Sequence, residues 1–310
     1  MERLSSVFTV AFLEMLARLA GWLPWLLLVM LLLFLYRLPS IRMARRRRRL
    51  IQRLEERRGS RVIAMIHRGG GPLALIRGGG SIGLFESETI LKIIRETPPE
   101  RPIDLLLHTP GGLILSSAQI ARALKNHPAP VRVIVPHWAM SGGTFLSLAA
   151  DEIIMDRNAV LGPVDPQTVS LKGQVAMASV LRVVREKSRD EIEDETWILV
   201  DQAEKILREM EQHLCDLMEE RLGAEKAREI ARTMTQGRWT HGYPLTWEAL
   251  RDMGLKVSTD VPEEAYQLLE LFPAGGRFRP VQWLPGRKRA AEPDGIQGAS
   301  VSSSRLPSGS

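Results

Sequence analysis

The sequence predicts an α/β domain with a mainly parallel sheet, preceded by one membrane-spanning helix. Between residues 61 and 254, short apolar runs rich in β-branched residues alternate with helical periods, and the connections are short. This alternation is typical of parallel strands joined by right-handed crossovers. An uncharged apolar stretch at residues 19–36 predicts the membrane helix. The composition, 45% hydrophobic and 25% charged, excludes a wholly disordered chain.

The stretch at 19–36 is just long enough to cross a hydrocarbon core of roughly 30 Å. Trp22, Trp25 and Tyr36 lie near its ends, where interfacial aromatic side chains gather. Five consecutive arginines, Arg45–Arg49, follow it, whereas a cleaved signal peptide carries its positive charge before the apolar stretch. The positive-inside rule therefore predicts a single-pass protein of the cell membrane with its C-terminal side in the cytoplasm.

Positive charge is concentrated in the first 58 residues. They hold twelve arginines against four glutamates, a net charge of +8, which leaves −2 of the total of +6 for the rest of the chain. Residues 37–60 are therefore predicted to form a basic helix whose arginines lie against anionic headgroups, each contributing about 1 kcal/mol. A nuclear-localisation signal would also fit the arginine run alone, but nucleic-acid binding by the whole protein loses its main support. The single cysteine, Cys215, excludes a disulfide framework and a cysteine-rich metal site.

The elements of the domain follow from periodicity and from turn residues. The expected strands are short apolar runs: 61–67, 102–112, 131–136 and 152–156. The expected helices carry apolar residues at helical spacing: 87–96, 113–127, 141–151, 175–186, 194–221, 224–234 and 246–253. Two loops each contain a short strand, 68–81 (at 73–76) and 159–167, and Gly254 ends the last helix.

Five segments result from these patterns. They are an N-terminal lead-in at 1–18, the span at 19–36, the basic helix at 37–60, the α/β domain at 61–275 and a tail at 276–310. The tail is polar and rich in small residues, so we expect it to be disordered.

Two glycine turns carry the residues that could perform chemistry. Gly111 and Gly112 follow a strand, and Ser141, Gly142 and Gly143 open a helix after the next strand. Parallel α/β folds bind ligands at these carboxyl ends. A serine at a helix start, with the next N–H facing the same point, suits nucleophilic attack on a carbonyl with backbone donors for the oxyanion. The alternative is that the serine is only an N-cap and the glycines only form turns.

The sequence resembles the Clp-protease/crotonase fold in four runs: HTPGG, AMSGGTFLSLAADEIIMD, LGPVDPQ and GRWTHGYPLTWEALRDMGL. More narrowly it resembles the serine dehydrogenase proteinases, relatives of signal peptide peptidase A and of the Clp protease proteolytic subunit. The resemblance covers about residues 40–275. It implies a repeated ββα superhelix, serine peptidase chemistry without a metal or cofactor, and a homo-oligomer. It does not imply dehydrogenase chemistry, because no phosphate-binding GxGxxG run follows a strand.

The resemblance also implies roles for individual residues. Ser141 matches the nucleophilic serine, and Gly112 and Gly142 match the donors of the oxyanion hole. The residues then expected to bind substrate are Gly111, Gly143 and His137.

The related families use two different residue types as the general base. The Clp subunit has a histidine some two dozen residues past the serine, where this sequence has Asp165 and no nearby histidine. Signal peptide peptidases use a lysine, and Lys187 lies at about their separation from the serine; Lys172 and Lys205 are further candidates. We therefore expect Lys187 to be the base, although a lysine in so charged a stretch is usually solvated, and a lysine serves as a base only where burial keeps it neutral.

The leading hypothesis is a membrane-anchored serine peptidase that hydrolyses peptide bonds at the cytoplasmic face with Ser141 and Lys187. Its substrates would be peptides or segments of membrane proteins, and residues 19–58 would contact lipid. No nucleic acid, metal or organic cofactor is expected. A crotonase-like acyl-thioester enzyme and a catalytically inactive membrane scaffold are the alternatives.

Overall fold

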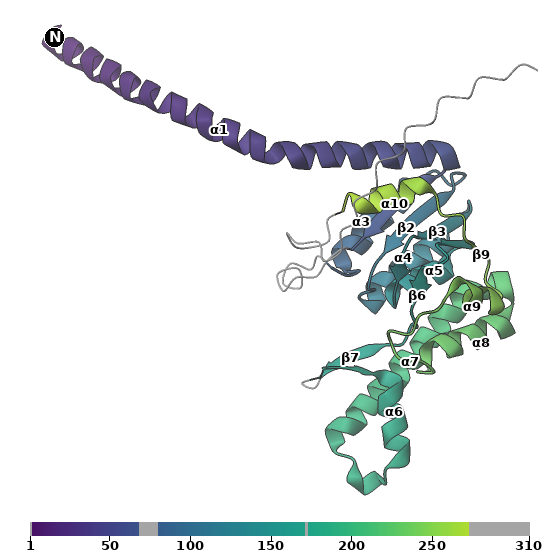
Figure 1. Cartoon of the computed structure of the whole chain (residues 1–310). Coiled ribbons are helices and arrows are strands. Elements are labelled where there is room, and N and C mark those ends of the chain that lie inside the picture. The colour runs from purple at the N-terminus through teal and green to yellow at the C-terminus, as the bar shows by residue number, and fades with distance from the viewer. Residues whose placement is uncertain (1, 68–79, 171–172, 273–310) are drawn as a thin grey trace, which may run out of the picture. The chain divides into compact units, whose positions relative to one another are not determined.

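The computed structural model describes residues 2–67, 80–170 and 173–272, and its centre is a five-stranded parallel sheet (Figure 1). The strand order is β1-β2-β3-β5-β9. These strands are β1 (Arg61–Ile66), β2 (Ile103–His108), β3 (Val131–Val135), β5 (Glu152–Met155) and β9 (Val257–Ser258). All six residues of β2 are buried, as expected for an inner strand of a parallel sheet covered on both faces. The predicted α/β class with a parallel sheet is confirmed.

Different helices cover the two faces of the sheet. Side chains alternate along β2, so Leu105 and Leu107 point to one face and Leu106 to the other. The first pair packs in the larger core with apolar residues of α3 (Leu84–Arg95), α4 (Ile114–Lys125), α5 (Gly142–Ala149), α7 (Asp194–Leu222) and α8 (Ala224–Thr235). Leu106 packs in a smaller core with α10 (Glu263–Glu270) and Leu50.

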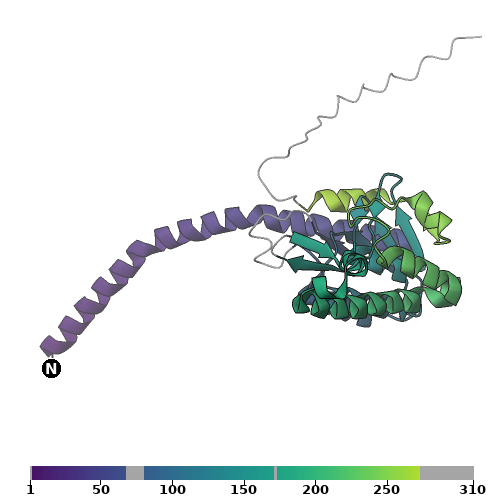
Figure 2. The same ribbon diagram turned by 90° about the horizontal axis from the view of Figure 1, so that it is seen from below.

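The apolar stretch and the basic segment form one helix, α1 (Glu2–Arg58), which both views show without interruption (Figures 1 and 2). Its part from Gly21 to Arg58 is long and apolar enough to cross a membrane by length and composition, with a mean hydropathy of 1.9 in its most apolar window. No residue of that window is buried in the protein.

The C-terminal part of α1 docks on the domain through its arginines. Arg47 donates to the Leu271 carbonyl at 2.6 Å, and its guanidinium lies 4.0 Å from the centre of the Phe272 ring. Arg58 lies 2.5 Å from a carboxylate oxygen of Asp104, which is fully buried in β2. Arg57 also pairs with Glu264 of α10 at 3.0 Å, so three arginines of the predicted basic segment bind the domain. Contact of the segment with headgroups stays a prediction.

The remaining elements among the described residues are four short strands, two helices and one 3-10 turn. They are β4 (Trp138–Ala139), β6 (Val160–Leu161), β7 (Gln167–Ser170), β8 (Gly173–Ala176), α6 (Met177–Glu186), the 3-10 turn η1 (Arg189–Glu191) and α9 (Trp247–Asp252). α6 packs on α7, and α7 packs on α8.

Several elements differ from the expectation. α3 begins at Leu84 rather than Ser87, because the Glu86 side chain accepts from the Gly83 amide at 3.0 Å and caps an earlier turn. β7 and β8 form an antiparallel hairpin where no strands were predicted, and β9 and α10 were also missed. The expected strand at 73–76 and the tail at 276–310 lie outside the described residues.

Candidate active site

The turn after β2 packs its backbone directly against the residues around Ser141. Gly111 has a φ of +103°, and a Cβ added there would lie 2.8 Å from the Ser141 Cβ. A Cβ added at Gly112 would lie 2.1 Å from the Ile82 carbonyl oxygen. Ile82 holds the turn from the other side, since its amide donates to the Gly111 carbonyl at 2.7 Å and its carbonyl accepts from Leu113 at 2.8 Å. Both glycines are therefore required by close approach of the backbone.

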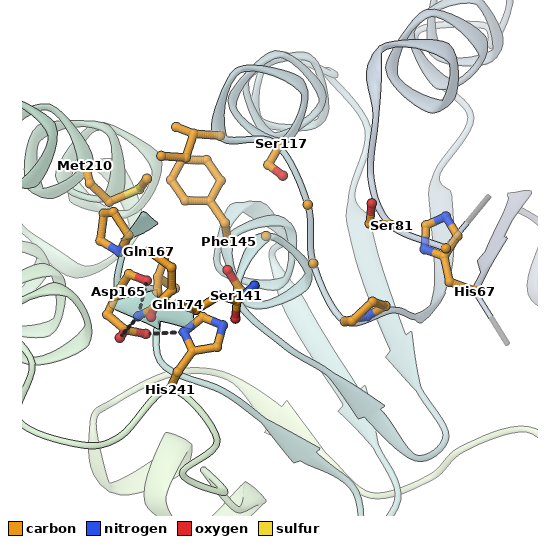
Figure 3. Close-up of a pocket in the computed structure, with 18 of the residues that line it drawn as sticks. His67, Ser81, Ser117, Ser141, Phe145, Asp165, Gln167, Gln174, Met210 and His241 are labelled. Atoms are coloured by element: carbon orange, nitrogen blue, oxygen red, sulfur yellow. Dashed lines mark hydrogen bonds and ion pairs between the residues drawn. The ribbon is translucent and has the colours of Figure 1, made fainter. Parts of the chain in front are cut away.

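Ser141 itself has an unusual backbone conformation. Its φ is +48° and its ψ −112°, and it is the one non-glycine residue with positive φ in the described part of the chain. Such a conformation costs about 1–3 kcal/mol and persists where the surrounding structure imposes it. Its side chain makes no capping hydrogen bond to α5, so the interpretation of Ser141 as only an N-cap lacks its main contact. The hydroxyl instead lines a cavity (Figure 3).

Two backbone amides beside Ser141 are available as donors. Gly112 and Gly142 both line the cavity, and within the described residues neither amide donates to a protein acceptor. Gly142 is the first residue of α5, so the partial positive charge of the helix end adds to its N–H. Amides arranged in this way stabilise negative charge that develops on an oxygen during attack by the serine.

A histidine and an aspartate form the second part of the site. His241 Nδ1 lies 2.5 Å from Asp165 Oδ1, and both residues line the same cavity as Ser141. The hydrogen bond to Asp165 raises the pKa of His241 above its ordinary value of 6.5, although burial opposes the shift. In Figure 3 the ring lies on the Ser141 side of the carboxylate.

Asp165 and the loop that carries His241 are both held in place. Asp165 is 2% exposed, and its second oxygen accepts from Gln167 Nε2 at 2.5 Å. The His241 loop is closed by a pair of backbone hydrogen bonds between Leu161 and Leu245, at 3.0 and 2.8 Å. Asp165 can therefore fix the imidazole in the tautomer that carries its proton on Nδ1 and leaves Nε2 free to act as a base.

The cavity has a volume of about 790 Å³, and part of its lining is apolar. The apolar residues include Ile114, Trp138, Phe145, Val164 and Met210. His67 also lines it, with Nδ1 2.8 Å from the Thr109 hydroxyl, and burial lowers the pKa of this second histidine. Within residues 2–67, 80–170 and 173–272, no cluster of three or more His, Cys, Asp and Glu side chains could hold a metal ion.

The structure brings some of the predicted site residues together and separates others. Ser141, Gly111, Gly112 and Gly142 all line the cavity. Lys187 does not: it is the C-cap residue of α6 and its side chain is exposed.

Two predicted substrate-binding residues also lie outside the cavity lining. His137 is exposed, with its ring 6.3 Å from that of Tyr266 and 5.9 Å from that of His108. Gly143 is buried, and a Cβ added there would lie 2.6 Å from the Thr109 side chain. Gly143 therefore serves the packing of the two turns.

His241 was not predicted from the sequence, because it lies beyond Lys172, Lys187 and Lys205, the residues whose separation from Ser141 made them candidates for the base. The available signal was that one of the four runs that carry the resemblance, GRWTHGYPLTWEALRDMGL, contains this histidine.

Comparison with known proteins identifies relatives over most of the chain. The model of the family described as ClpP-like SDH-type serine proteinase matches residues 11–296. Two uncharacterized proteins of Methanocaldococcus jannaschii are similar. MJ0137 is 47% identical, and the match covers 77% of this chain and 83% of MJ0137. MJ1495 is 49% identical, and the match covers 82% of this chain and 86% of MJ1495.

Two solved structures are more distantly similar. A variant of the 1510-N membrane-bound stomatin-specific protease is 18% identical, covering 68% of this chain and 82% of its own, with a TM-score of 0.43. ClpP1 from Listeria monocytogenes is 16% identical, with a TM-score of 0.39. The match covers 67% of this chain and 95% of ClpP1. Family membership therefore rests on the family match and on the two relatives.

Proposed function

We propose that this chain, which belongs to the family of ClpP-like SDH-type serine proteinases, hydrolyses peptide bonds with Ser141, His241 and Asp165. The observation that carries the proposal is that a hydrogen-bonded His–Asp pair and a strained serine line one cavity. Gly112 and Gly142 supply the oxyanion donors. In this proposal His241 takes the place that the sequence analysis gave to Lys187.

The mechanism follows from these positions. Ser141 Oγ attacks the substrate carbonyl carbon while its proton moves to Nε2 of His241. Asp165 accepts from Nδ1 and stabilises the imidazolium, and the two amides stabilise the oxyanion. Collapse of the tetrahedral intermediate breaks the C–N bond, His241 returns the proton to the leaving amine, and water then hydrolyses the acyl-enzyme by the same steps.

The shape and lining of the cavity indicate a substrate preference. Phe145 and Met210 lie near Ser141 in Figure 3, and Ile114 lines the same cavity. These apolar residues offer a place for an apolar side chain next to the scissile bond. We therefore propose peptides or membrane-protein segments with apolar residues at the cleavage site as substrates.

Anchoring in the membrane is a further part of this proposal. The apolar part of α1 supports a single membrane span, and the arginines that follow it support a cytoplasmic location of the domain. We also propose a homo-oligomer, which light scattering of the detergent-solubilised full chain would measure.

The alternatives make different predictions for the serine. A crotonase-like enzyme would use the same oxyanion donors without acylation of Ser141. An inactive scaffold would need no general base, whereas His241, paired with Asp165 at the cavity, offers one.

Intact mass of the full chain after incubation with a fluorophosphonate tests the proposal. We expect one adduct on the wild type and none on Ser141→Ala, because only an activated serine reacts with the phosphorus centre. Absence of an adduct on folded wild-type protein would refute the peptidase proposal and favour thioester chemistry or a scaffold.

A further inference from the structure

A buried hydroxyl that the mechanism above does not use faces the active-site cavity. Ser117 lies on α4, in the turn that follows Gly112, and is 2% exposed. The residue lines the cavity, and its buried Oγ has no hydrogen-bond partner within the described part of the chain. Figure 3 shows the hydroxyl pointing from α4 into the cavity.

The position of this hydroxyl relative to the two oxyanion donors is well defined. The point where a Cβ of Gly142 would lie is 2.4 Å from Ser117 Oγ and 3.3 Å from the Gly112 amide nitrogen. The hydroxyl and the Gly112 amide therefore converge on the backbone of Gly142, whose own amide is the other donor. A side chain at Gly142 would displace the hydroxyl from this place.

An unpartnered buried hydroxyl is costly to the folded protein. Leaving it unsatisfied destabilises the folded state, and alanine in the same helix would remove this cost and improve helix propensity. A serine in a helix commonly relieves the cost by bonding a carbonyl four residues back. The carbonyl four residues back, that of Leu113, accepts from the Ser117 backbone amide at 3.0 Å, and no bond to it from the Ser117 hydroxyl occurs among the described residues. The hydroxyl is therefore left free to donate to a group that enters the cavity.

We propose that Ser117 is a third donor to the oxyanion that forms when Ser141 attacks, an inference that rests on the proposed peptidase function. When the Oγ–C bond forms, the carbonyl π pair moves to the oxygen, and the Ser117 O–H donates a hydrogen bond to it beside the two amides. The proton of Ser117 stays on its oxygen throughout, and only Ser141 and His241 exchange a proton. As the tetrahedral intermediate collapses, the electron pair on the oxyanion re-forms the carbonyl π bond, and the hydrogen bond from Ser117 weakens.

The chain offers a matched control in the adjacent residue. Ser116 is also fully buried on α4, and its Oγ likewise has no partner among the described residues, but it does not line the cavity. Ser116→Ala and Ser117→Ala should therefore change stability in the same direction, and only Ser117→Ala should change the chemistry.

The experiment measures fluorophosphonate labelling of the full chain in detergent, because the phosphoryl oxygen occupies the oxyanion position. For Ser117→Ala we expect the maximal labelling rate to fall about 10- to 100-fold with an unchanged half-saturating probe concentration, because the two amides remain. For Ser116→Ala we expect the wild-type rate. The thermal midpoint of both variants should stay level or rise.

The outcomes separate this inference from the proposed function. Labelling of Ser117→Ala at the wild-type rate would overturn the third donor and leave the peptidase proposal intact. A change in half-saturation alone would also overturn it, because it would place Ser117 in substrate binding. Absence of labelling on the folded wild type would overturn the peptidase proposal, and this inference with it.

Discussion

The nucleophile half of the site, Ser141 with Gly111, Gly112 and Gly142, is built from backbone, whereas the base half, Asp165 with Gln167 and His241, is built from side chains. In the nucleophile half two turns pack at distances that admit only glycine. In the base half, one hydrogen bond of 2.5 Å holds the imidazole among the described residues, and the His241 side chain is 35% exposed.

This difference predicts different consequences of mutation. A change in the nucleophile half disturbs the packing between two strand ends, so activity and stability should fall together. A change in the base half removes a proton acceptor from the edge of the cavity, so activity should fall while the fold is retained.

The largest effect is expected from Gly112→Ala. The added Cβ would lie 2.1 Å from the Ile82 carbonyl oxygen, so the turn must move away from Ser141. We expect a loss of stability of about 3 kcal/mol or more in urea denaturation, together with loss of fluorophosphonate labelling. Gly242→Ala is the control, since nothing lies within 4 Å of a Cβ there. A stable Gly112→Ala protein labelled at the wild-type rate would contradict the backbone origin of the nucleophile half.

His241→Ala should reduce the labelling rate by about 10³-fold, because the general base is lost. Its thermal midpoint should change little, because the side chain is partly exposed. Lys187→Ala, measured in parallel, should label like the wild type, since that side chain is exposed outside the cavity. The reverse pattern would restore the lysine as the base.

Asp165→Asn should change the pH dependence of labelling. In the proposed mechanism the reaction needs neutral His241. We therefore expect the wild-type rate to rise with pH through a midpoint above 6.5, because the hydrogen bond to Asp165 raises the pKa of His241. The variant should show a lower midpoint and a plateau reduced by about 10²-fold. Asp156→Asn is the control, because Asp156 accepts from Tyr266 at 2.5 Å outside the cavity. An unchanged midpoint in Asp165→Asn would show that this pair does not control the reaction.

The smallest effect is expected from Tyr243→Ala. The Tyr243 ring stacks on Trp239 at 5.1 Å with an interplanar angle of 7°, and His241 lies between the two in the chain. Loss of the stack, about 1 kcal/mol, should loosen the His241 loop and slow labelling about threefold, measured at saturating probe. Tyr266→Phe should have no effect on the rate. A Tyr243→Ala variant as slow as His241→Ala would mean that the stack is required for the site.

The nucleophile half could be predicted from the sequence. Gly111, Gly112, Ser141 and Gly142 stand in two short local runs whose residue types reflect their own backbone geometry. The strands that lead to them are continuous buried runs, so their positions were predicted to within a few residues.

The base half has no such local signal. His241 lies 76 residues from Asp165, and its loop is brought back only by the two-residue contact of Leu161 with Leu245. The same reason explains why β9 and α10 were missed, since a two-residue strand and an eight-residue helix depend on tertiary packing more than on periodicity. The unpaired Ser117 hydroxyl has no sequence signature at all.

The docking of α1 on the domain has a consequence for where cleavage could take place. With the apolar stretch in a bilayer, the helix from Tyr36 to Arg47 rises by about 16 Å before it is bound to the Leu271 carbonyl. Such a tether is too short and too stiff to let the domain sample the bulk solution. Ser141 would then lie in a thin layer next to the lipid. A polypeptide attached to the same membrane would meet it at a high local concentration, and a freely diffusing one would meet it rarely.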